Sequence, residues 1–332
     1  MKRKCLSSLP VGLLAALFIM VLAASALAAD FPSRPFEVIA PGGAGGGWDT
    51  TARLTAKVLG ETGLITQPMP VINKPGGGGG VGLAYMQKKK GDPYSLIVYS
   101  PPLLLINLTG QTKLSFRDVT PLAMLINDFG AFAVPKDSPY QTIGDVMEAL
   151  KKDPKSVKTG GNSSFGSMDH IQFLQAAKAA GVENIKDIPY IAFQEGPMAA
   201  LMGGHIDLLS TGMAETVGPL EAGEIRVLAL TSPERVDAGV LGQVPTLKES
   251  GIDTAFINWR GFFGAPGLGE AEKAHLVEAM QKMTETAEWD DVCAKNGWTK
   301  AFMGADDFAA FLAKTEGEYK DLLTEIGLYK AQ

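Results

Sequence analysis

The sequence predicts an α/β protein built from two lobes, and two observations carry this prediction. Beyond the N-terminal segment, short β-like runs alternate with amphipathic helical stretches, an order typical of parallel α/β sheets. From about residue 270 the pattern becomes mainly helical, as expected of a chain that builds a second lobe and then returns to complete the first. The 332 residues are enough to give each lobe its own core.

Hydrophobic periodicity places the individual elements along the chain. Helices are expected at residues 49–59, 81–87, 143–151, 167–180, 270–285 and 306–326, with Asp49 and Ser167 as N-caps. Strands are expected at 36–40, 70–73, 95–99, 206–209 and 226–230. Two extended apolar segments, 131–135 and 255–261, are expected to cross between the lobes as hinge strands. The predicted organisation is a discontinuous lobe 1, residues 29–130 plus 259–332, and a lobe 2 of residues 131–258.

The first 28 residues predict a signal peptide that is cleaved on export. Residues 2–4 are all basic, residues 11–24 form an apolar run, and residues 26–28 are an Ala-Leu-Ala cleavage site. A transmembrane anchor is the alternative, but it needs about 20 apolar residues. We therefore expect a protein that is exported to the periplasm.

Charge and cysteine content exclude several classes of function. The chain has a net charge of −6, and removal of the basic residues 2–4 makes the mature chain more acidic. Nucleic-acid binding needs a positive field, so it is not expected. The mature chain keeps one cysteine, Cys293, and cannot form an internal disulfide. An anionic ligand must be held by a local positive site against the overall charge.

A glycine-rich loop at residues 41–50 joins the first strand to the first helix. Glycines allow the backbone to approach a ligand, and a helix N-terminus supplies free N–H donors and a partial positive charge. Together they predict an anion site, with Trp48 lying against the carbon skeleton of the ligand. The alternative is a tight turn with a buried tryptophan. The candidate ligand-binding residues are Gly45, Gly46, Gly47, Trp48 and Asp49.

A second glycine run, residues 76–82, follows the strand at 70–73. It matches G-x-G-x-x-G, but five consecutive glycines match that pattern easily, and no acid follows at the spacing that holds a ribose. We expect this run, with Gly78, and Ser100 after the strand at 95–99 to form a second wall of the same cleft.

The other candidates lie in the predicted second lobe and at its second crossing. A loop of small hydroxyl residues opens the helix at 167–180, and two such helix starts facing each other would grip both ends of a dicarboxylate or tricarboxylate. Two further segments follow strands, where ligands of open α/β sheets collect. Arg260 is expected either to bind a carboxylate or to pair with Glu195, Glu215 or another acid. The candidates are Ser163, Gly166, Ser167, Phe193, Gln194, Thr211 and Arg260, while His170 is as consistent with a structural role.

Motifs typical of enzymes do not appear in the sequence. The three histidines are far apart, and there is no H-E-x-x-H, no Cys/His cluster, no G-x-S-x-G and no G-K-[ST]. We therefore predict no catalytic residues, no metal ligands and no cofactor.

The chain resembles the substrate-binding components of tripartite tricarboxylate transporters over nearly its whole mature length. The tryptophan of the first loop and residues 258–261 resemble the tricarboxylate branch of that family. The segments that carry the resemblance are FPSRP at 31–35, GGGWD at 45–49, NKPG at 73–76, FGS at 165–167, GGHID at 203–207, AGEIR at 222–226, PTLKESG at 245–251 and NWRG at 258–261.

The resemblance implies a hinged two-lobe periplasmic-binding-protein fold, the type II or Venus-flytrap form. It implies a monomer that captures a di- or tricarboxylate between residues 45–49 and 163–167 and delivers it to a permease of one large and one small membrane subunit. The chain departs from relatives at residues 162–164 and 194–197, where Glu195 would repel a third carboxylate or contact an amine or hydroxyl. The alternatives are a ligand-presenting partner of a membrane sensor and an exported enzyme that acts on a carboxylate.

Overall fold

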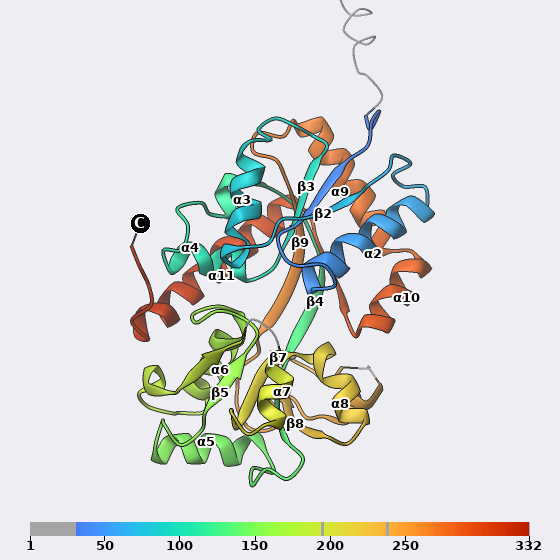
Figure 1. Ribbon diagram of the computed structural model, residues 1–332. Helices are drawn as coiled ribbons and strands as arrows, with labels where there is room; N and C mark the ends of the chain where they lie inside the picture. The colour runs from blue at the N-terminus through green and yellow to red at the C-terminus, as the bar shows by residue number, and fades with distance from the viewer. Residues whose placement is uncertain (1–30, 194–195, 237–238, 332) are drawn as a thin grey trace, which may run out of the picture.

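Two α/β lobes are joined by a pair of long strands in the computed structural model, which describes residues 31–193, 196–236 and 239–331 (Figure 1). The strands are β4 (Thr120–Pro135), which runs from the upper lobe toward the lower one, and β9 (Ile257–Gly264), which lies antiparallel to it and runs back. The predicted signal peptide and Gln194 lie outside the described residues. Among the described helices, none has a long enough apolar stretch to cross a membrane.

The lobe that begins the chain is built on a mixed sheet. β1 (Glu37–Ala40) pairs in parallel with β2 (Val71–Asn73) and with β3 (Ser95–Tyr99). β9 is antiparallel to β3 and to residues 120–129 of β4, and β10 (Thr299–Met303) adds to β4. The described helices of this lobe are α2 (Gly47–Glu61), α3 (Gly80–Gln87), α4 (Pro102–Leu108), α9 (Glu270–Thr284), α10 (Ala287–Asn296) and α11 (Ala305–Glu325).

The second lobe continues the same strand β4 into a different set of partners. Residues 130–135 pair antiparallel with β7 (Leu208–Gly212) and β8 (Ile225–Leu230). β5 (Thr159–Gly161) lies parallel to β7 and to β6 (Tyr190–Ala192). Its helices are α5 (Ile143–Lys152), α6 (Met168–Ala179), α7 (Pro197–Met202) and α8 (Val217–Glu221). Short 3-10 turns are η1 (Gly77–Gly79), η2 (Phe116–Asp118), η3 (Ile185–Asp187), η4 (Met213–Thr216) and η5 (Gly239–Gln243).

Apolar side chains cover the sheets on both faces. One cluster is centred on the faces of β1, β3 and β9 that meet α3, α4 and α11, and it continues into the second lobe under α5 and α6. A second cluster fills the opposite face of the first lobe, and a third fills the opposite face of the second lobe. β9 is buried over nearly its whole length, which explains its apolar sequence and makes it a central strand.

The sequence located most of the longer helices and strands correctly. It missed elements whose formation depends on packing against neighbouring segments. The strands at 37–40, 71–73, 95–99 and 225–230 and six helices agree with prediction. The expectation of a parallel sheet was wrong in part, because β4, β9 and β10 pair antiparallel. The sequence also missed α4, α7, α8, α10, β5, β6 and β10, which are short or have no amphipathic period of their own. Cys293 is a buried free thiol, and burial raises its pKa to about 12.

Candidate functional site

A cavity of about 520 Å³ lies where the two lobes meet. Both lobes and both crossing strands contribute to its walls. The first lobe supplies the loop before α2, the glycine run and the residues after β3, and the second supplies the loop before α6 and the turn after β7. The lining residues are Gly42, Gly43, Gly45, Gly46, Gly47, Trp48, Thr50, Gly78, Ser100, Pro102, Asp128, Asn162, Ser163, Ser164, Ser167, Met168, Asp169, Gly212, Ala214, Glu215, Asn258, Arg260, Asn296 and Trp298.

The start of α2 forms one wall of the cavity. The helix begins at Gly47, and its N-cap is Gly46, which makes no side-chain capping bond. The first N–H groups of a helix have no intrahelical acceptor, so those of this 15-residue helix remain available to an anion at the cavity wall. Gly45 has φ 77°, a conformation that favours glycine and lets the loop turn into the helix.

Asp49 stabilises this loop from behind. It is not the N-cap that the sequence predicted, because the helix begins two residues earlier. Its buried carboxylate accepts hydrogen bonds from the backbone N–H of Gly45 at 2.9 Å, from Arg53 Nε and from Asn73 Nδ2. Arg53 lowers the pKa of Asp49 to about 2 despite partial burial, and Gly45 and Asn73 add to this effect. The side chain therefore fixes the loop and points away from the cavity lining.

Replacing Asp49 with asparagine is expected to lower the free energy of unfolding by about 1–2 kcal/mol at pH 7. The effect is limited because Arg53 is half exposed and solvent partly screens its charge. Because the pKa is lowered in the folded protein, the advantage of the wild type is complete above about pH 4 and disappears as the pH falls toward 2. Denaturant titrations of both proteins across this range measure it. A difference that persists unchanged at pH 2 would contradict this role for Asp49.

Trp48 and the second glycine run meet at the next part of the wall. Trp48 Nε1 donates to Ser100 Oγ at 2.9 Å, and the indole packs edge-on against Tyr99. A Cβ at Gly79 would come within 2.9 Å of Tyr99 and 3.3 Å of Trp48, so the glycine run can lie against the indole only without a side chain. The hydrogen bond to Ser100 fixes the orientation of Trp48 at the cavity.

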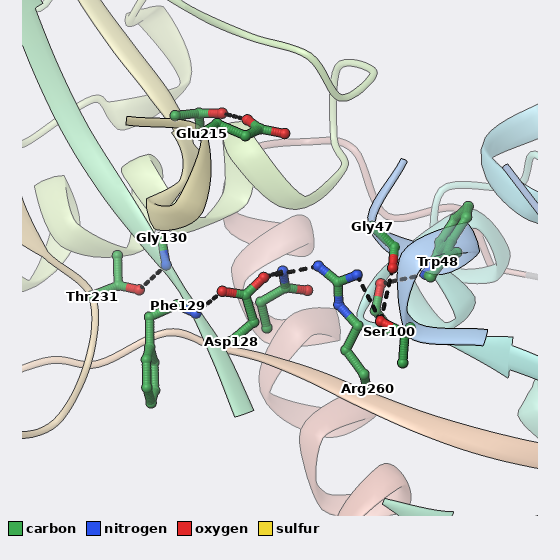
Figure 2. A network of polar contacts seen from close by, with 12 residues as sticks. Gly47, Trp48, Ser100, Asp128, Phe129, Gly130, Glu215, Thr231 and Arg260 are labelled. Carbon is green, nitrogen blue, oxygen red and sulfur yellow. Dashed lines mark hydrogen bonds and ion pairs between the residues drawn. The ribbon is translucent and has the colours of Figure 1, made fainter. Parts of the chain in front are cut away.

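Arg260 on β9 is paired with an acid that the sequence analysis did not name. Figure 2 shows its guanidinium between Asp128 of β4 and the start of α2 at Gly47. Nη2 lies 2.8 Å from Asp128 Oδ2, and both side chains are buried. Burial raises the pKa of Asp128, whereas Arg260 and the N–H of Phe129 lower it. The pair joins the two crossing strands, so Arg260 does not pair with Glu215 as one hypothesis allowed.

The loop before α6 forms the opposite wall. Ser167 is the N-cap as predicted but makes no side-chain capping bond. Ser163 Oγ instead accepts the N–H of Asp169 at 2.7 Å. His170 accepts the N–H of Gly166 at 3.1 Å, and burial lowers its pKa to about 4. A neutral His170 packed between aromatic rings supports the structural alternative for this residue.

Two acids on this wall were not predicted to line the site, although Glu215 was named as a possible partner of Arg260. Asp169 Oδ2 accepts the N–H groups of Asn162 at 2.8 Å and Ser163 at 2.9 Å. Its Oδ1 is buried and has no hydrogen-bond partner among the described residues. Burial and, to a smaller extent, the nearby charge of Glu215 raise the pKa of Asp169 to about 7, against the lowering effect of the two backbone bonds. Glu215, in η4, lines the cavity and accepts from the hydroxyl of Thr211.

The predicted residues divide into those that line the cavity and those that lie behind it. Asp49, Gly166, Phe193 and Thr211 are not among the lining residues. Thr211 contacts Glu215, and Phe193 packs beside the third apolar cluster. The nine predicted residues on the lining are Gly45, Gly46, Gly47, Trp48, Gly78, Ser100, Ser163, Ser167 and Arg260.

The residues that the sequence analysis missed are mostly acids and amides within apolar stretches. Asp128 stands in the middle of the apolar run 120–135, and this isolation is a signal that could have identified it. Asp169 and Glu215 lie one turn beyond motifs that were noticed. Within residues 31–193, 196–236 and 239–331, no group of three or more His, Cys, Asp or Glu side chains could hold a metal ion.

Comparisons with known proteins agree with this architecture. Residues 52–328 match the family described as the tripartite tricarboxylate transporter family receptor. The chain is 30% identical over 322 residues to a UPF0065 protein of Cupriavidus necator, covering 96% of this chain and 95% of that protein. It is 29% identical to a TctC solute-binding protein from Polaromonas, with a TM-score of 0.71 over 89% of this chain and 99% of that structure.

A Rhodopseudomonas palustris protein solved with adipate has the same fold. Its TM-score is 0.78 at 22% identity, over 90% of this chain and 99% of that structure. The two-lobe fold of periplasmic binding proteins, expected from the resemblance, is thereby confirmed. The family match covers most of the chain and includes the second-lobe wall and Arg260, and it begins just after the loop that leads into α2. The chain belongs to the tripartite tricarboxylate transporter receptor family and is a solute-binding protein of this periplasmic family.

Proposed function

We propose that the protein captures a small carboxylate between its lobes and delivers it to a permease in the membrane. The observation that carries this proposal is the uncapped start of α2, which lines a cavity of about 520 Å³ between the lobes. The net charge of the chain is −6, so the helix dipole and free N–H groups supply the local positive site that an anion needs.

Capture is proposed to close the two lobes around the ligand, with the hinge along β4 and β9. Residues 120–129 of β4 pair within lobe 1 and residues 130–135 pair within lobe 2, so this strand passes directly between the lobes. These pairings support a lobe 1 of residues 29–130 plus 259–332 and a lobe 2 of residues 131–258. A ligand that contacts both walls stabilises the closed arrangement more than the open one and shifts the population toward it.

The ligand is proposed to contact the predicted residues on the cavity lining, from Gly45 to Trp48 on one wall and Ser163 and Ser167 on the other. Adipate in the similar Rhodopseudomonas palustris structure supports a carboxylate. The family resemblance favours a di- or tricarboxylate, whereas the acids that line the cavity favour a ligand with fewer negative charges.

Delivery is proposed to occur from a mature monomer in the periplasm after removal of residues 1–28. The closed form would dock on a permease with one large and one small membrane subunit. Repeated delivery requires release, so this interface is expected to be small and transient. Loss of carboxylate uptake in cells that lack the protein would support transport, whereas normal uptake would count against it.

A thermal-shift screen of the protein purified from the periplasm tests ligand capture. Mono-, di- and tricarboxylates and amino carboxylates are compared with their methyl esters, which keep the carbon skeleton without the charge. A carboxylate at about 100 times its Kd is expected to stabilise the protein by about 2.7 kcal/mol, and its ester much less. Unchanged ligand recovered after incubation is expected of a binding protein. Equal shifts with acid and ester, or no shift with any carboxylate, would overturn the proposal.

A further inference from the structure

The second-lobe wall of the cavity offers hydrogen-bond acceptors where a carboxylate would need donors. The N–H groups of Asn162 and Ser163 donate to Asp169 Oδ2, and the N–H of Asp169 donates to Ser163 Oγ. The first turn of α6 therefore carries its own carboxylate in the place of a ligand anion. These three N–H groups are therefore not available to a carboxylate of the ligand.

Two buried acceptors on the lining have no partner among the described residues. They are Oδ1 of Asp169 and Oδ1 of Asn258, and both side chains are 2% exposed. A buried polar atom without a partner costs about 1–3 kcal/mol, and a positive charge on a ligand in the adjoining cavity would offset part of that cost. The neighbouring carboxylate of Glu215 also lines the cavity.

The charge of the lining leads to the same conclusion. The described lining residues include one cation, Arg260, and Asp128 holds it at 2.8 Å. Figure 2 shows this pair in one group of contacts and Glu215 in another. Asp169 and Glu215 are therefore left without a cation, and a ligand carboxylate on this wall would face both.

We propose that Asp169 and Glu215 select a ligand that carries a protonated nitrogen on the second-lobe side and a carboxylate at the start of α2. The preferred ligand is thus a small amino carboxylate or a similar zwitterion. The ammonium donates to Glu215 and is attracted by the neighbouring carboxylate of Asp169, while the carboxylate takes the free N–H groups of α2. This inference rests on the proposed capture of a carboxylate and adds the second group that the ligand must carry.

Binding of matched pairs by calorimetry tests this selection. Succinate is compared with β-alanine, glutarate with 4-aminobutyrate, and adipate with 5-aminopentanoate, since each pair shares its methylene spacer and differs in one end group. At pH 8 at least one amino carboxylate is expected to bind about tenfold or more tightly than its dicarboxylate. Tighter binding of the dicarboxylate in every pair would overturn the selection and leave carboxylate capture intact. No binding in either series would overturn carboxylate capture and the selection with it.

Variants assign the selection to the two acids. Glu215→Gln and Asp169→Asn are each expected to weaken binding of the best amino carboxylate by about 10- to 100-fold and not to weaken binding of its dicarboxylate. The matched control is Glu221→Gln on α8, an exposed acid outside the cavity lining. Glu215 is itself exposed, so its variant is expected to fold. Unchanged affinity in both acid variants would overturn the assignment.

The pH dependence of the affinity distinguishes two roles of Asp169: a carboxylate that attracts a ligand ammonium, or a protonated acid that donates to a ligand carboxylate. Affinity for an amino carboxylate is expected to rise as the pH rises through about 7, because Asp169 then becomes the carboxylate that attracts the ammonium. The groups that face Asp169 are Glu215, His170 and Tyr190. Burial keeps His170 and Tyr190 neutral across this range by lowering the pKa of the first and raising that of the second. An affinity that falls through pH 7 would instead mean that protonated Asp169 donates to a ligand carboxylate.

Discussion

Replacing Arg260 with alanine is expected to lower the free energy of unfolding by about 3–5 kcal/mol. The substitution leaves Asp128 buried without its cation, and its remaining partners among the described residues are the N–H of Phe129 and the amide of Asn258. Both side chains belong to the crossing strands β4 and β9, so the loss falls on the segment that connects the lobes. Urea denaturation of wild type and variant at pH 7 measures the effect.

Two further variants show whether the loss comes from the unpaired charge. Arg117→Ala removes the bidentate pair with Glu316, in which Arg117 is more than half exposed, and is expected to cost less than about 1 kcal/mol. Asp128→Asn combined with Arg260→Met is expected to recover much of the stability, because the buried charge is gone. If the double variant is as unstable as Arg260→Ala, packing and not charge accounts for the loss.

Replacing Gly47 with alanine is expected to destabilise the protein by about 1–3 kcal/mol and to weaken ligand binding about tenfold or more. A Cβ at Gly47 would come within 2.2 Å of Arg260 Nη1 and 2.7 Å of Nη2. The guanidinium is buried against Asp128 and cannot withdraw without losing that pair. The start of α2, with its free N–H groups, would be displaced from the cavity wall.

The matched control for Gly47 is Gly60 in the same helix. A Cβ there meets nothing within 4 Å, and the residue is exposed. Gly60→Ala is expected to leave ligand binding unchanged and to stabilise the protein by about 0.5–1 kcal/mol, since alanine favours the helix more than glycine does. Thermal denaturation and calorimetry of both variants make the comparison. Similar behaviour of the two would mean that the contact with Arg260 does not constrain Gly47.

The first wall of the site could be predicted from the sequence because its signals are local. A strand, a glycine loop and a helical period follow one another within residues 36–61, and their order alone places backbone N–H groups at the start of α2. The error lay in the helix boundary, since Asp49 reads as an N-cap but lies inside the helix. Boundaries depend on which carbonyl and N–H groups find partners, and periodicity does not determine this.

The second wall could not be predicted to the same depth. The loop at 162–167 was expected to bind an anion by analogy with the first loop. Only the folded chain shows that Asp169 accepts the N–H groups of Asn162 and Ser163 in this loop. It also shows that Glu215, in the turn after β7, lies near the carboxylate of Asp169. The charge of a cavity is a sum over segments far apart in sequence, and local patterns do not report it.

The sequence by itself determined the class of fold, the two lobes and the glycine loop at the start of α2, because propensity and periodicity act between residues close along the chain. Tertiary structure alone decided that the partner of Arg260 is Asp128, 132 residues away, and that two acids on the second wall lack a cation. Burial raises the cost of an unpaired charge or acceptor, and burial exists only once distant segments have packed together.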